Sequence, residues 1–212
     1  FFYTAAAPCL NKAGGTPQEV DVLLGGDLLT QIMAASMAAR ELGTPFLGLY
    51  GACSTMAESL CVGAMLVDGG HMRNALCAAS SHFCTAERQY RFPLEYGSQR
   101  TPTAQWTVTG AGAALISAEV NFKPLARCAM VTVGTVTDMG IADANNMGAA
   151  MAPAAADTLR RPFADTGRRA EDYDLIITGD LGKVGHDLML ELMQEQGMPL
   201  IPSRYMDCLL YT

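Results

Sequence analysis

A cysteine at a predicted strand-to-helix turn is the residue best suited to chemistry in this sequence. Cys53 lies in Gly-Ala-Cys-Ser-Thr at 51–55, between an apolar run at 46–50 and a stretch with helical spacing. Small residues let the chain reverse sharply there, and the N–H groups and positive dipole end of the following helix favour thiolate over thiol. Such a thiolate is a thioester-forming nucleophile. The spacing is equally compatible with a small residue that only fills a tight turn.

Cationic side chains gather in one segment of an otherwise acidic protein. Residues 80–92 contain His82, Arg88 and Arg91, and the two arginines, three apart, would share a face of a helical turn. Guanidinium groups bind carboxylates through two hydrogen bonds, and a histidine adds a directional donor. The segment therefore suits a planar diacid. The structural alternative pairs Arg88 with a nearby glutamate such as Glu87 and makes His82 a hydrogen-bonded structural residue.

Strand and helix patterns alternate along the chain, which predicts a largely parallel sheet with helices on its faces. A capping-box pattern from Thr16 to Glu19 predicts a brief helical turn before the first strand, and Pro162 is expected to kink or end the helix that contains it. The predicted strands lie at 21–25, 46–50, 74–80, 103–118, 126–137, 174–178 and from 199 onward. The predicted helices lie at about 28–42, 55–68, 149–164 and 185–196.

Two segments of the chain align without gaps. Residues 10–28 match residues 163–181, so that Asp27 pairs with Asp180, 153 positions later. Both copies read as helix, turn and buried strand followed by Gly-Asp-Leu, which indicates an internal duplication. A duplicated fold places its cleft where the halves meet. The paired aspartates themselves are expected to cap the helices that follow them.

Composition excludes several classes of protein. Half of the 212 residues are apolar, the net charge is −7, and no run of Lys or Arg exists, so no nucleic-acid partner is expected. The seven cysteines are scattered and odd in number. We therefore expect reduced thiols, as in cytosol, with no metal site and no disulfide framework. There is no nucleotide-cofactor fingerprint.

The chain also lacks the signals that direct a protein into or across a membrane. No apolar stretch reaches membrane-spanning length, and the opening FFYTAAAPCL has no basic flank, so we predict neither a transmembrane segment nor a signal peptide. The chain begins with Phe and ends inside an apolar run, which predicts cuts at both ends.

Three features together resemble those of the thiolase superfamily. They are a duplicated half, a cysteine at the strand–helix turn of the first half, and Asp207-Cys208 in the second. Longer strings resemble, within it, the stage V sporulation protein AD family of spore-forming Firmicutes, and they cover nearly the whole chain. These strings are GDLLTQ, PFLGLYGACSTMAESL, SSH with TAERQYRFPLEYG, TVTGAGA and MGIADANNMGAAMAPAAADTL.

The resemblance implies an internally duplicated, thiolase-like α/β fold of α/β/α layers. Residues 1–125 would be the N-terminal half without its first strand, and residues 126–212 the start of an incomplete C-terminal half. Two positions depart from the family pattern: a more polar stretch is expected where Arg204 begins Arg-Tyr-Met, and glycine is expected at Leu209. In thiolases the general acid/base histidine comes from the part of the second half beyond Thr212.

The resemblance also implies binding of dipicolinic acid, pyridine-2,6-dicarboxylate, for its uptake into the developing spore. We expect a soluble, homodimeric subunit, cytoplasmic or peripheral at the spore inner membrane, working with membrane proteins of the same operon. Cys53 corresponds to the condensing-enzyme nucleophile at the floor of the ligand pocket, and His82, Glu87, Arg88 and Arg91 are expected around the ligand. A non-catalytic protein without cofactor or metal is expected; the alternative is a thiolase or ketoacyl-synthase-type acyltransferase that uses Cys53 as nucleophile.

Overall fold

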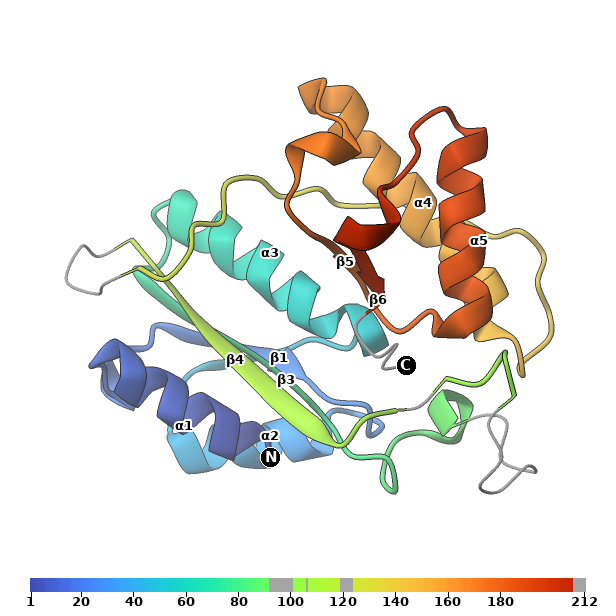
Figure 1. The fold of residues 1–212 in the computed structure, drawn as a ribbon. Helices are drawn as coiled ribbons and strands as arrows, with labels where there is room; N and C mark the ends of the chain where they lie inside the picture. The colour runs from blue at the N-terminus through green and yellow to red at the C-terminus, as the bar shows by residue number, and fades with distance from the viewer. Residues whose placement is uncertain (92–100, 106, 119–123, 208–212) are drawn as a thin grey trace. The chain divides into compact units, whose positions relative to one another are not determined.

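The computed structural model describes residues 1–91, 101–105, 107–118 and 124–207 (Figure 1). The chain forms two compact units, here called the first and the second unit. The first consists of residues 1–87 and 107–131, and the second of residues 88–106 and 132–212. The division at 125/126 implied by the resemblance stays a prediction.

The first unit is built on a four-stranded sheet with strand order β2-β1-β3-β4. Its strands are β1 (Val22–Gly26), β2 (Phe46–Gly48), β3 (Asn74–Ser81) and β4 (Gly110–Ser117). Strand β1 pairs in parallel with β2 and β3, whereas β4 runs antiparallel to β3. The carboxyl ends of the three parallel strands therefore lie at one edge, where sheets of this kind form their ligand sites.

Helices cover both faces of this sheet. They are α1 (Phe2–Ala13), α2 (Met33–Leu42) and α3 (Thr55–Asp68). Alternate residues of a strand point to opposite faces: Leu23 packs with α1 and α2, whereas Leu24 and Cys77 lie on the α3 side. A Cβ added at Gly63 of α3 would lie 2.8 Å from the Cys77 sulfur, so glycine permits this close packing. Burial raises the pKa of the Cys77 thiol to about 12.

The second unit pairs two helices with a two-stranded parallel sheet. Its elements are α4 (Met147–Thr166), β5 (Ile176–Thr178), α5 (Gly182–Glu195) and β6 (Tyr205–Asp207). Helices α4 and α5 come close at glycines. A Cβ atom added at Gly148 would overlap the Leu181 carbonyl oxygen and lie 2.9 Å from the Gly185 nitrogen. Larger residues could not allow this approach. Met189, Met193 and Phe163 are buried in the core beside the contact.

The duplication inferred from the sequence is present in the local structure. Strands β1 and β5 are each preceded by a short 3-10 helix, η1 (Pro17–Glu19) and η4 (Ala170–Asp172), at the same offset of 153 residues. Both are closed alike, since Thr16 N donates to Glu19 (2.7 Å) and Arg169 N to Asp172 (2.8 Å). Left-handed glycines, Gly14 and Gly167, end the helices before them. The internally duplicated α/β class is confirmed.

Two local predictions were wrong, and Pro162 does not end its helix. Residues 126–137 form no strand: Val133 and Val136 are 70% and 99% exposed, and no described strand lies beside them to accept their hydrogen bonds. Among the described residues of the run at 103–118, which leave out residue 106, only 110–117 are strand. Helix α4 continues through Pro162 to Thr166, because the next residue, Phe163, remains buried in the core and its packing compensates for the lost hydrogen bond. Helix α1 was not foreseen.

Within the described ranges, none of the helices combines the length and apolar character that crossing a membrane requires.

Candidate functional site

Cys53 lies at a tight elbow between β2 and α3. It belongs to the short 3-10 helix η2 (Ala52–Ser54), and its side chain is exposed. The residue before it, Ala52, has φ 50°, in the left-handed region that costs a non-glycine residue roughly 1 kcal/mol or more. The Gly51 carbonyl accepts both the Ser54 N–H (3.0 Å) and its hydroxyl (2.7 Å), which closes the turn. The predicted strand-to-helix turn is therefore present; the nucleophilic role of Cys53 stays a prediction.

Asp27, at the carboxyl end of β1, organises the loop into α2. Its carboxylate is buried and accepts the N–H groups of Leu29 (2.8 Å) and Ala35 (2.7 Å). The capping role predicted for Asp27 is thus what the structure shows. Between those two donors, Gln31 and Ile32 have φ values of 60° and 51°. These hydrogen bonds hold the loop while Gln31 and Ile32 adopt a left-handed conformation that non-glycine residues disfavour.

Glu87 holds the same loop from the other side. Its carboxylate accepts the Thr30 N–H at 2.8 Å, and its own N–H donates to the Leu28 carbonyl at 2.9 Å. The glutamate predicted to lie near a ligand is therefore engaged with the backbone of the loop between β1 and α2. A ligand contact by Glu87 stays a prediction.

His82 follows β3 directly. Its Nδ1 accepts the Cys84 N–H at 3.2 Å, so the neutral ring carries its proton on Nε2 and can donate from there. The ring lies 5.5 Å from the ring of Phe1, tilted by 44°. The His82 carbonyl also accepts the Ala86 N–H (2.9 Å), which fixes the turn after the strand.

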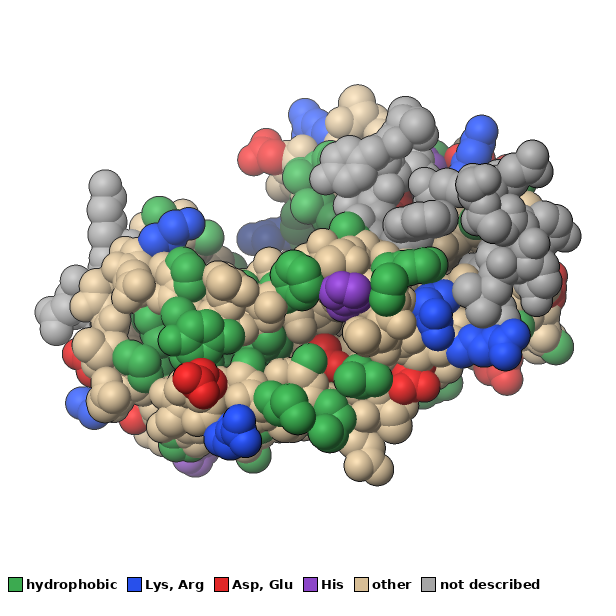
Figure 2. Space-filling model, turned by 90° about the horizontal axis from the view of Figure 1, so that it is seen from below, with side chains coloured by type: hydrophobic (Ala, Val, Ile, Leu, Met, Phe, Trp, Pro, Cys, Tyr) green, Lys and Arg blue, Asp and Glu red, His purple; other side chains and the backbone are tan. Residues whose placement is uncertain are grey.

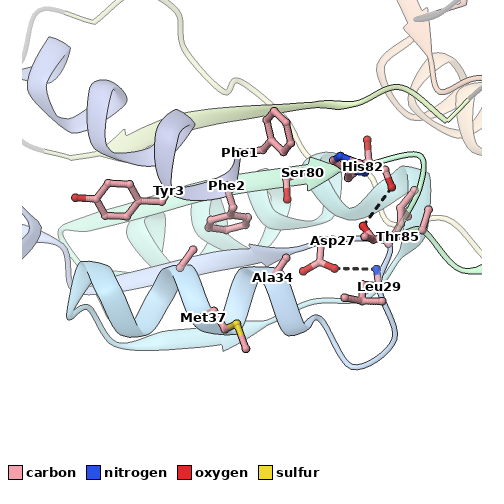
Figure 3. Close-up of a pocket in the computed structure, with 14 residues that line it drawn as sticks. Phe1, Phe2, Tyr3, Asp27, Leu29, Ala34, Met37, Ser80, His82 and Thr85 are labelled. Carbon is pink, nitrogen blue, oxygen red and sulfur yellow. Dashed lines mark hydrogen bonds between the residues drawn. The ribbon is translucent and has the colours of Figure 1, made fainter.

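A cavity of about 300 Å³ opens in the first unit beside His82. Phe1 and Phe2 reach it from the start of α1, Met37 from α2, and Ser80 from β3 (Figure 3). Its other lining residues are Tyr3, Asp27, Leu28, Leu29, Ala34, Ala38, Ser81, Thr85 and Ala86. Neither Cys53 nor any Lys or Arg is among this described lining. The cavity therefore suits an apolar or aromatic group better than an anion.

Arg88 and Arg91 form the short 3-10 helix η3 (Arg88–Arg91), so the helical turn predicted for them is present. The Arg91 Nε is buried and has no hydrogen-bond partner among the described residues. Both arginines belong to the second unit, whereas Cys53, His82 and Glu87 belong to the first. The five predicted residues are thus divided between the two units.

The second unit has its own polar cluster at the carboxyl ends of β5 and β6. Asp180 accepts the Gly182 N–H at 3.1 Å, repeating the bond from Leu29 to Asp27 in the first unit. Asp207 accepts the Leu181 N–H at 2.6 Å, and both aspartates are buried. The duplication therefore extends to the hydrogen bonds that follow each strand.

Sequence reasoning missed one contact in this cluster. His186 lies in α5 with its side chain 18% exposed, and its ring is stacked on that of Tyr205 at a centroid distance of 4.8 Å. The Tyr205 hydroxyl is 3.1 Å from the Thr178 hydroxyl, and burial raises the Tyr205 pKa to about 12. No local sequence signal would have revealed this contact, because His186 and Tyr205 come from different elements.

Within the described residues, no group of three His, Cys, Asp or Glu side chains is placed to hold a metal ion.

The chain is similar in structure to solved condensing enzymes. OleA from Xanthomonas campestris, with bound lauric acid and lauroyl-CoA, matches with a TM-score of 0.68 and 15% identity, over 97% of this chain and 66% of that one. The 3-oxoacyl-[acyl-carrier-protein] synthase III of Aquifex aeolicus matches with a TM-score of 0.65 and 14% identity, over 97% and 67%. These likenesses establish the thiolase-like fold.

The amino-acid sequence is similar to that of a sporulation protein. The chain is 48% identical over 205 residues to the stage V sporulation protein AD of Bacillus subtilis (strain 168), covering 96% of this chain and 60% of that protein. The chain thus spans three fifths of the length of this curated relative. The model of the stage V sporulation protein AD (SpoVAD) family matches residues 1–212. The chain therefore belongs to the stage V sporulation protein AD family.

Proposed function

We propose that this protein binds dipicolinate for its uptake into the developing spore. It would act as a subunit beside membrane proteins of the same sporulation operon, at the spore inner membrane. The ligand class follows from the family resemblance. The observation that carries the proposal is the exposed elbow at Cys53, in a chain of a sporulation family whose fold is that of condensing enzymes.

The elbow offers suitable groups for a carboxylate. The positive end of a helix dipole favours a negative charge, and Cys53 stands in η2, directly before α3. Dipicolinate carries two carboxylates, while the protein carries a net charge of −7. Binding therefore needs local cations against an unfavourable overall field. The sequence prediction assigns that cationic role to Arg88 and Arg91, whose guanidinium forks match carboxylates, and within the first unit the Nε2 of His82 can donate a hydrogen bond.

Calorimetric titration with dipicolinate tests the proposal. We expect saturable binding, and about tenfold weaker binding in Arg88→Ala or Arg91→Ala, because a hydrogen bond to a charged group contributes about 1.5–3 kcal/mol. Arg40→Ala, which removes an exposed arginine of α2, is the matched control and should bind normally. Pyridine-3,5-dicarboxylate, with the same charge and different geometry, should bind more weakly. Normal binding in both arginine variants would show that the cationic site is wrong, and absence of saturation would refute dipicolinate binding.

Acyl transfer is the second candidate, favoured by the placement of Cys53. The Cys53 thiolate would attack the carbonyl carbon of an acyl-CoA; a new sulfur–carbon bond forms, the thioester bond to CoA breaks, and the CoA thiolate leaves and takes up a proton. One solved neighbour is named 3-oxoacyl-[acyl-carrier-protein] synthase III, and another holds lauric acid and lauroyl-CoA. Intact mass after incubation with acyl-CoA should then show an acyl adduct in the wild type and in Cys84→Ser, but none in Cys53→Ser.

We also propose a homodimer. Strand β2 ends the described sheet, and apolar side chains near it are exposed: Met37 is 57%, Leu47 52% and Tyr50 45% exposed. Apolar side chains also gather on the face that α1 and α2 form (Figure 2). A self-complementary pair related by a two-fold axis would bury them. Light scattering should give the mass of two chains, and Leu47→Lys should give that of one.

A further inference from the structure

Ile32 has a backbone conformation that its own side chain disfavours. Its φ and ψ are 51° and 42°, and Gln31 before it has φ 60°. β-Branched residues avoid this left-handed region because the Cβ atom crowds the backbone. Residues in such conformations persist only where their surroundings hold them, and they cluster at functional sites. The fold therefore has to hold Ile32 in place.

Hydrogen bonds hold the loop of Ile32 from two sides. Asp27 accepts N–H groups before and after it, from Leu29 and Ala35. Glu87, 57 residues along the chain from Thr30, accepts the Thr30 N–H. These bonds join the end of β1, the start of α2 and the segment after β3. The left-handed conformation of Ile32 is thus determined by contacts outside its own residue.

The Ile32 side chain packs against glycine backbone in two strands, β1 and β2. Of these, β2 leads into the Cys53 elbow. A Cβ at Gly48 of β2 would overlap the Ile32 Cδ1, and one at Gly26 of β1 would lie 3.0 Å from its Cγ2. Leu49, which follows Gly48, donates its N–H to the Gly25 carbonyl of β1 (2.9 Å). Ile32 therefore packs where β2 ends, immediately before the turn.

We infer that Ile32 is a positioning residue for Cys53. Its side chain packs on Gly48 and keeps the end of β2 in register, so that the turn through Ala52 delivers the Cys53 sulfur to the start of α3. Removing the side chain leaves Gly48 without support, and the elbow gains freedom. The left-handed conformation of Ala52 then relaxes, and the thiol loses its place at the helix N-terminus.

The test is the rate at which iodoacetamide alkylates Cys53, followed by peptide mass in the 212-residue chain. Cys53 is already exposed, so a looser elbow cannot greatly increase access. Loss of the helix N-terminus lowers the thiolate population, and Ile32→Ala should slow alkylation by roughly threefold. Cys84 and Cys128, both exposed, should react at unchanged rates. Cys77, fully buried, should stay protected if the unit remains folded.

Two further variants separate positioning from general damage. Ile32→Leu keeps an apolar side chain over Gly48 and should react at the wild-type rate. Gly48→Ala places a methyl group where Cδ1 lies, so it should slow Cys53 as Ile32→Ala does. The double variant, Ile32→Ala with Gly48→Ala, leaves space for the added methyl group. Its rate of Cys53 alkylation should therefore return toward that of the wild type. A wild-type Cys53 rate in Ile32→Ala with Cys77 protected overturns the inference. So does a combined variant slower than both single ones. The alkylation assay needs no dipicolinate, so its outcome does not depend on whether the proposed function is correct.

Discussion

Replacing Asp27 by alanine should weaken the first unit more than any surface substitution. Asp27 is 4% exposed and its two oxygens accept the N–H groups of Leu29 and Ala35. Alanine leaves both donors without their acceptor at the point where the chain turns from β1 into α2. Asparagine, of the same shape, keeps one acceptor oxygen but turns its NH₂ group toward the second donor.

The magnitude follows from these contacts. Two hydrogen bonds to a charged group contribute about 3–6 kcal/mol. Without the clamp, Gln31 and Ile32 can leave the left-handed region, which recovers roughly 2 kcal/mol in all. The net loss in Asp27→Ala is therefore about 1–4 kcal/mol, and Asp27→Asn should lose about half of that. A domain of total stability about 5–15 kcal/mol would remain folded but be measurably weaker.

Protection of Cys77 reports this loss within the first unit. Its sulfur is inaccessible in the folded unit, so pulse alkylation of Cys77 across a urea series gives the unfolding free energy. Asp180→Ala is the matched control, because Asp180 is the duplicate of Asp27 in the second unit. It should leave the Cys77 midpoint unchanged. An Asp27→Ala free energy within about 0.5 kcal/mol of wild type, as for a surface substitution, would refute the reasoning.

Two further predictions concern other parts of the fold. Gly148→Ala should cost the second unit about 1–3 kcal/mol, since its methyl group would overlap backbone at the contact of α4 and α5. Gly110→Ala, with nothing within 4 Å of the added atom, should unfold like wild type when the helix signal in circular dichroism is followed across a urea series. The Asp21 carboxylate accepts the Asn74 and Arg73 N–H groups (2.9 and 2.7 Å), which lower its pKa from the ordinary 3.8. That stabilisation is present above pH 3.8 and lost as pH falls through the folded pKa. The stability difference between wild type and Asp21→Asn, measured by thermal melts, should therefore be full near pH 6 and shrink below pH 3.8; an unchanging difference would contradict this.

The sequence predicted the features that rest on local signals. The repeat of Gly-Asp-Leu after two buried strands led to the duplication, and Asp27 and Asp180 cap as equivalent residues should. The small residues around Cys53 predicted its elbow, which the structure contains. Each of these depends on neighbours along the chain, so residue type and spacing were sufficient.

Features set by distant contacts could not be read from the sequence. Glu87 binds the Thr30 N–H, 57 residues away, a contact that no local pattern predicts. The β-branched residues at 126–137 looked like a strand, but a strand needs a neighbour to pair with, and the pattern of one segment does not say whether a neighbour exists. The strain at Ile32 likewise depends on packing against Gly48.

A crystal structure of the protein with dipicolinate tests the central claim most directly. We expect one pyridine dicarboxylate with a carboxylate at the N-terminal end of α3, beside the sulfur of Cys53. An elbow without ligand at saturating dipicolinate, or a ligand seated instead in the cavity between Phe1 and His82, would contradict it.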